Sequence, residues 1–314
     1  MIKTSICELL GIEYPLLQGG MAHISDARLA AAVSEGGGLG IISAASGNIE
    51  QIEKEIDKIR TLTEKPFGVN VMLMGANVDE VARLLADKKV PVITTGAGDP
   101  SKYVPMWKEA GIKVIPVIPS AALSKLVSRG GVDAVIAEGG ESGGHVGEMT
   151  TMALVPQVCD TVDIPVIAAG GIADGRGFAA ALMLGAEGVQ IGTRFLSAFE
   201  CTISRTYKDK VLAAKDTSTI VTGRRLGHPV RSLKSPFSRA YAKAEYTDIS
   251  NEDLEQMGVG SLRKAVQDGD EKGGCFLAGQ ISGLVKEEQS AADIIKDIMK
   301  GAEEALKGGL QWVK

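Results

Sequence analysis

Cysteine is scarce in this sequence, and the few cysteines present form no recognisable binding pattern. The 314 residues include four of them, with no Cys-x-x-Cys pair and no histidine at ligand spacing. The pattern therefore predicts neither a disulfide framework nor a zinc site. Widely spaced thiols of this kind are typical of reduced cysteines in a cytoplasmic protein, and we expect no bound structural metal.

The sequence also lacks the marks of membrane proteins and nucleic-acid-binding proteins. No uninterrupted apolar run is long enough to span a membrane, and residues 1–5 lack the basic-then-apolar pattern of a signal peptide. The formal net charge of −5 argues against general affinity for nucleic acid or anionic membranes. We therefore expect a cytoplasmic protein with no membrane span and no nucleic-acid partner.

Aromatic residues are also few, at 4% of the chain, whereas glycine occurs 39 times, a balance that suggests many short turns. Eight short apolar segments recur at fairly even intervals, and most are rich in β-branched residues without alternating polarity. Such segments are typical of strands buried on both faces of a parallel sheet. The predicted strands are Pro15–Gln18, Gly38–Ser43, Phe67–Leu73, Pro91–Thr95, Lys113–Ile118, Ala134–Glu138, Pro165–Ala169 and Gly188–Gly192.

Amphipathic stretches of helical period lie between the predicted strands, including Ile49–Leu62, Val78–Ala86 and Asp174–Leu184. This repetition of a buried strand and an amphipathic helix predicts a (β/α)8 TIM barrel of the α/β class. A doubly wound open sheet is the alternative. It usually has fewer strands, and no Gly-x-Gly-x-x-Gly motif follows the first predicted strand.

The repeating pattern stops after the eighth predicted strand. Residues 202–285 are mixed, charged and irregular, and a good helical pattern returns only at Ser290–Leu306. We therefore predict a small, mainly helical cap inserted between strand 8 and helix 8 of the barrel. Residues 1–201 plus 286–314 would form the barrel domain, and residues 202–285 the cap, a substrate-binding subdomain.

The carboxyl ends of the barrel strands are where this fold places catalytic groups. The sixth predicted strand leads into residues 139–147, a stretch of nine that contains five glycines and His145. A titratable imidazole held in a glycine-rich loop at this position suits catalysis. The alternative is a flexible surface turn that carries an incidental histidine.

The ends of the seventh and eighth predicted strands carry Gly170, Gly171, Gly192 and Thr193. In a TIM barrel these two loops often bind phosphate, and these residues offer backbone N–H groups and one hydroxyl. A phosphate held there would lay an attached planar ring across the barrel mouth, as expected for flavin mononucleotide (FMN). The alternative is that the glycines only ease tight strand-to-helix packing.

Three polar side chains at strand ends, Gln18, Asn70 and Glu138, are difficult to explain as core residues. Buried amides and carboxylates need hydrogen-bond partners. A flavin offers such partners in its ring N–H and carbonyl groups and in its ribityl hydroxyls. Each of the three is therefore a candidate flavin contact.

These motifs together resemble a known family. Gln18–Met21, residues 139–147, Ala169–Ile172 and Gln190–Arg194 look like segments of the nitronate monooxygenase (2-nitropropane dioxygenase-like) flavoproteins. Within that superfamily the chain resembles, nearly end to end, the flavin-dependent enoyl-acyl-carrier-protein reductases of bacterial type II fatty-acid synthesis. The resemblance implies an FMN-containing TIM barrel with a small cap, usually dimeric, that takes electrons from NADPH or NADH.

The resemblance also implies which residues take part. His145 would be catalytic, either as a hydrogen-bond donor to the substrate oxygen or as the proton source. Members of this group often respond to a monovalent cation, which the sequence does not place, and the roles of His23 and His228 stay open. The residues implied to hold FMN are Gln18, Gly19, Gly20, Met21, Asn70, Glu138, Ser142, Gly143, Gly170, Gly171, Gly192 and Thr193.

A basic strip lies inside the predicted cap. Arg224, Arg225 and Arg231 belong to a stretch, residues 224–239, that contains no Asp or Glu in an otherwise acidic protein. Acyl carrier proteins are strongly acidic and the 2′-phosphate of NADPH is anionic, so we predict that these arginines contact one of them. The alternative is an ordinary solvated loop.

Two reactions fit this set of residues. The first is the enoyl-[acyl-carrier-protein] reductase reaction, in which hydride passes from NAD(P)H through FMN to the β-carbon of a trans-2-enoyl thioester. The second is nitronate monooxygenation, which uses FMN and O2 and needs no nicotinamide. A barrel that binds FMN or a phosphometabolite as a sensor, without turnover, is a third possibility. The basic strip favours the reductase, so we predict enoyl-acyl carrier protein and NAD(P)H as partners, and the resemblance implies a homodimer.

Overall fold

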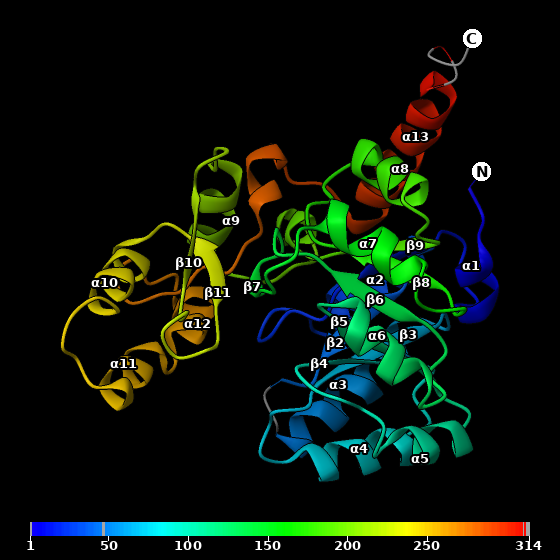
Figure 1. The fold of residues 1–314 in the computed structure, drawn as a ribbon, viewed down its shortest axis with the longest axis horizontal. Coiled ribbons are helices and arrows are strands. Elements are labelled where there is room, and N and C mark those ends of the chain that lie inside the picture. Colours follow the sequence, from blue (N-terminus) through cyan, green and yellow to red (C-terminus); the bar gives the residue numbers. More distant parts are fainter. Residues whose placement is uncertain (1, 46–47, 310, 312–314) are drawn as a thin grey trace.

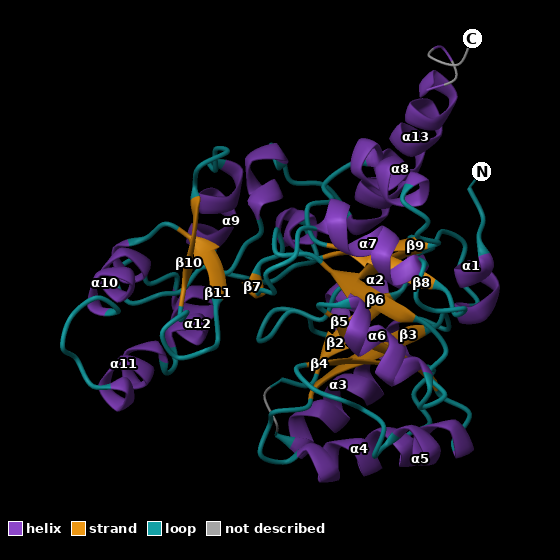
Figure 2. Cartoon of the chain, viewed as in Figure 1, coloured by secondary structure: helices purple, strands orange, loops and turns teal. Residues whose placement is uncertain are grey.

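The computed structural model describes residues 2–45, 48–309 and 311. Eight parallel strands form a barrel surrounded by helices, so the prediction of a TIM barrel is confirmed (Figures 1 and 2). The strand order is β1-β9-β8-β6-β5-β4-β3-β2, and each predicted segment overlaps one strand. The strands are β1 (Leu16–Gln18), β2 (Gly40–Ser43), β3 (Phe67–Met72), β4 (Val92–Gly96), β5 (Lys113–Ile118), β6 (Val135–Glu138), β8 (Val166–Ala169) and β9 (Gly188–Ile191).

The barrel closes between its first two strands. The Gln18 N–H donates to the Leu39 carbonyl and the Leu39 N–H donates to the Leu16 carbonyl, each over 2.9 Å. Helix α1 (Ser5–Leu10) covers the amino-terminal end of the barrel, because its Ile6 and Leu10 join the buried cluster inside it. This helix was not predicted from the sequence.

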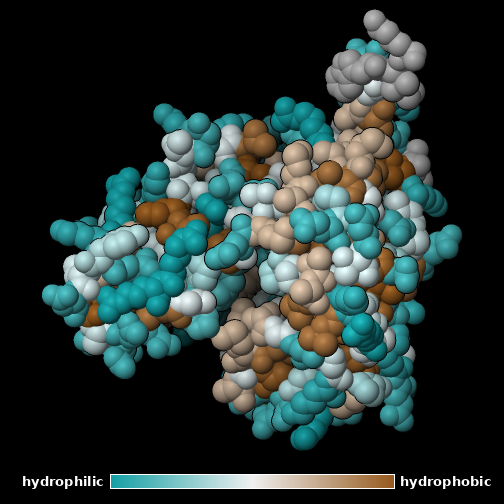
Figure 3. All heavy atoms as spheres, in the orientation of Figure 1, coloured by the Kyte–Doolittle hydropathy of each residue, from teal (hydrophilic) through white to brown (hydrophobic). Residues whose placement is uncertain are grey.

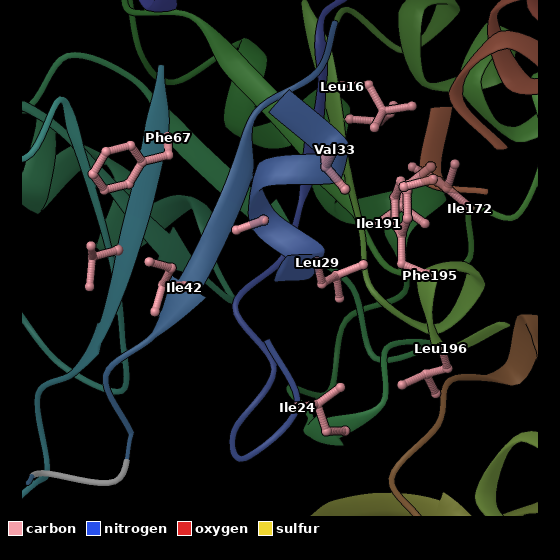
Figure 4. Close-up of a cluster of buried hydrophobic side chains, with 14 of the residues drawn as sticks. Leu16, Ile24, Leu29, Val33, Ile42, Phe67, Ile172, Ile191, Phe195 and Leu196 are labelled. Carbon is pink, nitrogen blue, oxygen red and sulfur yellow. The ribbon is translucent and has the colours of Figure 1, made fainter. Parts of the chain in front are cut away.

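Successive side chains of each strand point to opposite faces of the sheet, and both faces are buried. In β1, Leu17 belongs to the cluster inside the barrel, whereas Leu16 packs outward against helices. Figure 4 shows part of this outer layer, where Leu16 and Ile191 lie near Leu29 and Val33 of helix α2. Burial on both faces explains why the strands read as apolar runs without alternation.

Helices follow the strands around the outside of the barrel. Several begin at a side chain that accepts backbone N–H groups, as Asp26, Asn48, Ser120 and Asp174 do. All four predicted helices are present within a few residues of their predicted bounds. The helices are α2 (Ala27–Glu35), α3 (Ile49–Leu62), α4 (Val78–Asp87), α5 (Val104–Glu109), α6 (Ala121–Ser128), α7 (Thr151–Cys159), α8 (Gly175–Met183) and α13 (Ala291–Gly309).

Helix α13 takes the place of the eighth barrel helix, packed against α8 and α2. Its closest approach to α8 is at Gly175, where an added Cβ would lie 2.1 Å from the Ala302 nitrogen. Only a residue without a side chain fits this contact.

We expect Gly175→Ala to lower the free energy of unfolding by about 3 kcal/mol, because the two helices must separate to admit the methyl group. Urea denaturation of the purified variant would measure this loss. Gly258→Ala, also in a helix, is the control, since its Cβ would meet only the Tyr241 ring at an ordinary 3.8 Å. Equal stability of the two variants would contradict the prediction.

The elements between β9 and α13 lie largely beside the barrel (Figure 1). As predicted, most are helical, but β10 and β11 form an antiparallel hairpin that the sequence analysis missed. The hairpin also pairs with β7 (Gly144–His145), which belongs to the histidine loop (residues 139–147) of the barrel. The division into a barrel (1–201 plus 286–314) and a cap (202–285) remains our proposal.

No helix among the described residues has the length and apolar character needed to cross a lipid bilayer.

The other elements after β9 are short. The elements are η1 (Thr193–Ser197), α9 (Arg205–Leu212), β10 (Thr219–Thr222), β11 (Val230–Leu233), α10 (Pro236–Ala244), α11 (Asn251–Gly258), α12 (Ser261–Arg263), η2 (Lys264–Asp268) and η3 (Gln280–Leu284).

Candidate active site

A cavity lies at the carboxyl ends of the barrel strands, where the barrel meets residues 277–281. The surface is hollowed between the cap side and the barrel side of the molecule (Figure 3). The cavity volume of about 260 Å³ far exceeds the roughly 10–15 Å³ that one buried water requires. Its position is that of a ligand site in this type of fold.

The structure brings His145 and all but one of the predicted cofactor residues to this cavity, although they come from distant parts of the sequence. Their roles toward a ligand stay predictions. The predicted residues that line the cavity are Gly19, Gly20, Met21, Asn70, Glu138, Ser142, Gly143, His145, Gly170, Gly171, Gly192 and Thr193.

Gln18 is the predicted cofactor residue that does not line the cavity. Its buried amide donates to the Ser25 hydroxyl over 2.8 Å and to the Gly19 carbonyl, and it accepts from the Ile41 N–H over 3.2 Å. These bonds hold the Gly19–Gly20 turn in place. Gln18 therefore supports the cavity wall from behind.

Gln190, which was not among the predicted site residues, lines the cavity instead. Among the described residues, none hydrogen-bonds its side-chain amide. The strand pairing gives the reason, because Gln190 pairs with Leu17, which faces the barrel interior. Gln18 is the next residue along β1 and points to the opposite face.

Whether FMN fits the cavity can be judged from the polar groups of its wall whose hydrogen bonding is incomplete. The Ser142 hydroxyl is buried and makes no hydrogen bond of normal geometry to the described residues, although it lies close enough to the Glu138 carboxyl to influence its pKa. The Asn70 carbonyl accepts from Thr94 over 2.9 Å, while its NH2 group has no acceptor in the described part of the chain. Together with Gln190, these groups suit a ligand that carries both donors and acceptors, as a flavin does.

The glycines of the cavity wall fall into two groups. An added Cβ would lie 2.4 Å from the Asn70 side chain at Gly20, and 2.6 Å from the Ala278 backbone at Gly143. Close packing alone explains these two. At Gly192 the nearest atom would be the Met21 sulfur at an ordinary 3.6 Å, so the protein itself has room for a side chain. The absence of one at Gly192 favours close approach of a ligand to the backbone.

Among the titratable residues that line the cavity, Glu138 has the largest shift in pKa. Burial raises the pKa of its carboxyl from 4.5 to about 7, and the nearby Ser142 hydroxyl opposes this shift. Near neutral pH the carboxyl is therefore partly protonated, and in that form it can both donate and accept hydrogen bonds.

We expect Glu138→Gln to change the pH dependence of stability. The pKa of Glu138 is higher in the folded protein than the ordinary value of 4.5, so the folded state binds the proton more tightly. The native protein should therefore lose stability as pH rises from about 4.5 through 7, by up to about 3 kcal/mol, and the glutamine variant should escape this loss. Denaturation of both flavin-free proteins at pH 5 and pH 8 would measure it. A stability difference that is the same at both pH values would contradict the assignment.

His145 reaches the cavity from β7, held by its pairing with Val230 of β11. The next residue continues this contact, since the Val146 N–H donates to the Pro229 carbonyl over 3.0 Å. The side chain of His145 is exposed at the cavity mouth, yet the surrounding protein desolvates it in part and lowers its pKa, and the nearby His228 lowers the pKa further. At neutral pH the imidazole is therefore uncharged, with one N–H to donate and one nitrogen to accept.

The three predicted arginines have different surroundings, and none of them lines the cavity. The Arg225 guanidinium donates to Asn251, Thr247 and Ile249, which fixes the loop between α10 and α11. Arg231 donates to the Gly140 carbonyl of the histidine loop. Only at Arg224 is the residue exposed and its guanidinium without a hydrogen bond to another described residue. Contact with substrate, NADPH or a carrier protein stays a prediction, best suited to Arg224.

The two other histidines differ in location. His23 lines a second, smaller cavity together with Asp26, Gln51 and Glu55, and its backbone has a φ of 61°. His228 lies at the end of the β10–β11 hairpin loop, close enough to His145 to influence its charge. Neither histidine lines the main cavity.

Known proteins resemble this chain in both sequence and fold. A family model for nitronate monooxygenase matches residues 3–84 and 72–301. A probable nitronate monooxygenase from Staphylococcus aureus (strain MSSA476) is 36% identical over 309 residues, which cover 84% of this chain and 87% of that protein. The structure of FabK from Thermotoga maritima is 48% identical, with a TM-score of 0.98 and coverage of 100% of both chains.

A further relative has a different name. It is the (3aS,4S,5R,7aS)-5-hydroxy-7a-methyl-1-oxo-octahydro-1H-indene-4-carboxyl-CoA dehydrogenase of Rhodococcus jostii (strain RHA1). The two are 42% identical over 234 residues, which span 74% of this chain and 66% of that relative. Similarity to proteins of such different names places the chain in a family without selecting a reaction.

Proposed function

Because this chain belongs to the nitronate monooxygenase family, we propose that it is an FMN-dependent enoyl-[acyl-carrier-protein] reductase of that family. The observation that carries the proposal is the match with FabK, the type of flavin-dependent enoyl-acyl-carrier-protein reductase that the sequence resembles. The two chains are 48% identical over 100% of both. That match includes the cap and residues 277–281, which face the cavity. The probable nitronate monooxygenase is less similar, at 36% identity over 84% of the chain.

FMN suits the unsatisfied polar groups of the cavity. The backbone at Gly170, Gly171, Gly192 and Thr193 would hold the phosphate. The side chains of Asn70, Glu138, Ser142 and Gln190 would bind the ring and the ribityl chain. When bound, FMN supplies hydride transfer from NADPH or NADH to the β-carbon of a trans-2-enoyl thioester.

His145 would act on the substrate. As hydride reaches the β-carbon, negative charge grows on the thioester oxygen, and a positioned N–H donor stabilises that charge. Its lowered pKa supports this role over that of an imidazolium acid, because the ring is uncharged at neutral pH. The glycine-rich loop allows the backbone on either side of His145 to approach the ligand.

The remaining parts of the proposal concern partners. The exposed Arg224 would contact the acidic carrier protein or the 2′-phosphate of NADPH. The carboxyl-CoA named in the Rhodococcus relative is a thioester, as a carrier-bound enoyl group is, which supports a thioester substrate. We also propose a cytoplasmic homodimer that responds to a monovalent cation.

The alternative function is nitronate monooxygenation, which the family model and the Staphylococcus aureus relative support. Oxidation of NADPH or NADH by the purified flavoprotein, measured without oxygen, distinguishes the two reactions. We expect oxidation that depends on an added crotonyl or longer 2-enoyl thioester. Oxygen uptake with a nitronate and no response to thioester would instead support the monooxygenase. Bound flavin with neither activity would support a sensor.

A further inference from the structure

The histidine loop contains five glycines in nine residues, so its backbone has unusual conformational freedom. A catalytic imidazole in such a loop can be placed reproducibly only if neighbouring elements restrain the loop. The start of the loop is restrained by backbone bonds from the Gly139 N–H to the Ala169 carbonyl, from the Gly140 N–H to the Met149 carbonyl and from the Gln280 N–H to the Glu141 carbonyl. The Thr151 N–H and hydroxyl also donate to the Glu141 carboxylate. All of these bonds lie several residues before His145.

Hairpin β10–β11 supplies further restraints. Strand β11 pairs with Gly144 and His145, and the Pro229 carbonyl accepts the Val146 N–H. The half-buried Arg231 adds a side-chain contact, since its Nη2 and Nε donate to the Gly140 carbonyl over 2.9 and 3.3 Å. Its Nη1 donates to the Thr219 hydroxyl of β10 over 3.2 Å, which fixes the plane of the guanidinium.

We propose that Arg231 is a positioning residue, which holds the histidine loop against the β10–β11 hairpin and thereby sets the place of His145. It does not line the cavity, so it acts through the loop. A guanidinium suits this task, because its rigid fork reaches the Gly140 carbonyl and Thr219 together and keeps its charge. The expected effect on turnover rests on the proposed function. The tether, meaning the hydrogen bonds by which Arg231 joins the histidine loop to the hairpin, does not.

The test compares Arg231→Ala with the wild-type protein by three measurements. Amide hydrogen exchange of a peptide covering residues 139–149 should become about tenfold faster, because the loop opens more often. The NMR titration of His145 should move toward that of an ordinary histidine, since the loop leaves the surroundings that desolvate it. In the flavin-loaded reductase, kcat should fall about tenfold with little change in the KM for the thioester.

Lys234→Ala is the matched control. Its Nζ donates to the Thr217 carbonyl over 2.7 Å, so it ties together the other end of the same hairpin without touching the histidine loop. We expect wild-type behaviour in all three measurements. If Arg231→Ala does not fold, Arg231→Lys serves in its place, because a lysine keeps one donor for Gly140 and should give intermediate values.

The outcomes separate this inference from the proposed function. Unchanged exchange and an unchanged His145 titration in the Arg231 variant would overturn it, as would a higher KM with the loop unchanged, which indicates direct substrate contact. A wild-type protein that does not reduce enoyl thioesters would refute the proposed function. Faster exchange and a shifted His145 titration would still support the tether in that case.

Discussion

Replacing His145 by alanine is expected to lower kcat about 100-fold while the protein stays folded and keeps its flavin. The imidazole lines the cavity, and it is uncharged near neutral pH because partial desolvation and His228 lower its pKa. Its removal therefore takes away an N–H donor and leaves the cavity wall intact. Anaerobic stopped-flow measurement of the thioester-dependent step would show the loss, and the flavin spectrum would report cofactor content.

The pH profile distinguishes the two roles considered for His145. With the titration of Glu138 removed by Glu138→Gln, an uncharged N–H donor should give a rate that stays constant from about pH 7 to 8, because the uncharged ring already predominates above its lowered pKa. An imidazolium acid would instead lose activity across that range as the proton leaves. His145→Gln keeps an N–H donor and should recover part of the rate.

His23→Asn is the control for this substitution. His23 lies outside the main cavity at a φ of 61°, a conformation that asparagine tolerates better than most residues. We expect nearly wild-type turnover. Equal losses in the His23 and His145 variants would contradict a specific role for His145.

The barrel was predictable from the sequence because its signals are local. A segment such as Lys113–Ile118 is buried on both faces, so its apolar run marks the strand directly. Helix α3 has the same property, because Ile52, Ile56 and Ile59 fall on one face at helical spacing. In both cases the residues within one element are sufficient for the inference.

The missed elements depend on contacts between distant segments. Strand β7 has only two residues and exists because β11 lies beside it, so it has no periodicity of its own. Gln18 was predicted to line the cavity, but Gln190 does so, and the reason is similar. Which side of the sheet each amide faces follows from the pairing of β1 with β9. Arg225 and Arg231 formed part of a basic strip in the sequence, but backbone carbonyls far along the chain take up their donors.

The glycines predicted to bind phosphate show both what the sequence predicts and what it leaves out. Their presence at strand ends indicated a ligand, and the structure adds a packing requirement at some of them. Gly170 has a φ of 86°, and an added Cβ would lie 2.6 Å from the Gly139 carbonyl oxygen. That carbonyl belongs to the start of the histidine loop, so a side chain at position 170 would push the ends of β6 and β8 apart.

Gly170→Ala is accordingly expected to weaken FMN binding more than tenfold and to lower the melting temperature. The left-handed backbone costs alanine about 1–2 kcal/mol, and the clash with Gly139 adds to this cost at the cavity wall. Gly111→Ala separates the two effects. Its φ of 80° imposes similar strain, but the Cβ would meet no described atom within 4 Å, and the residue does not line the cavity. Titration of both flavin-free variants with FMN should find wild-type affinity only for Gly111→Ala. Equal affinity in both would refute a role in FMN binding for the loop that contains Gly170.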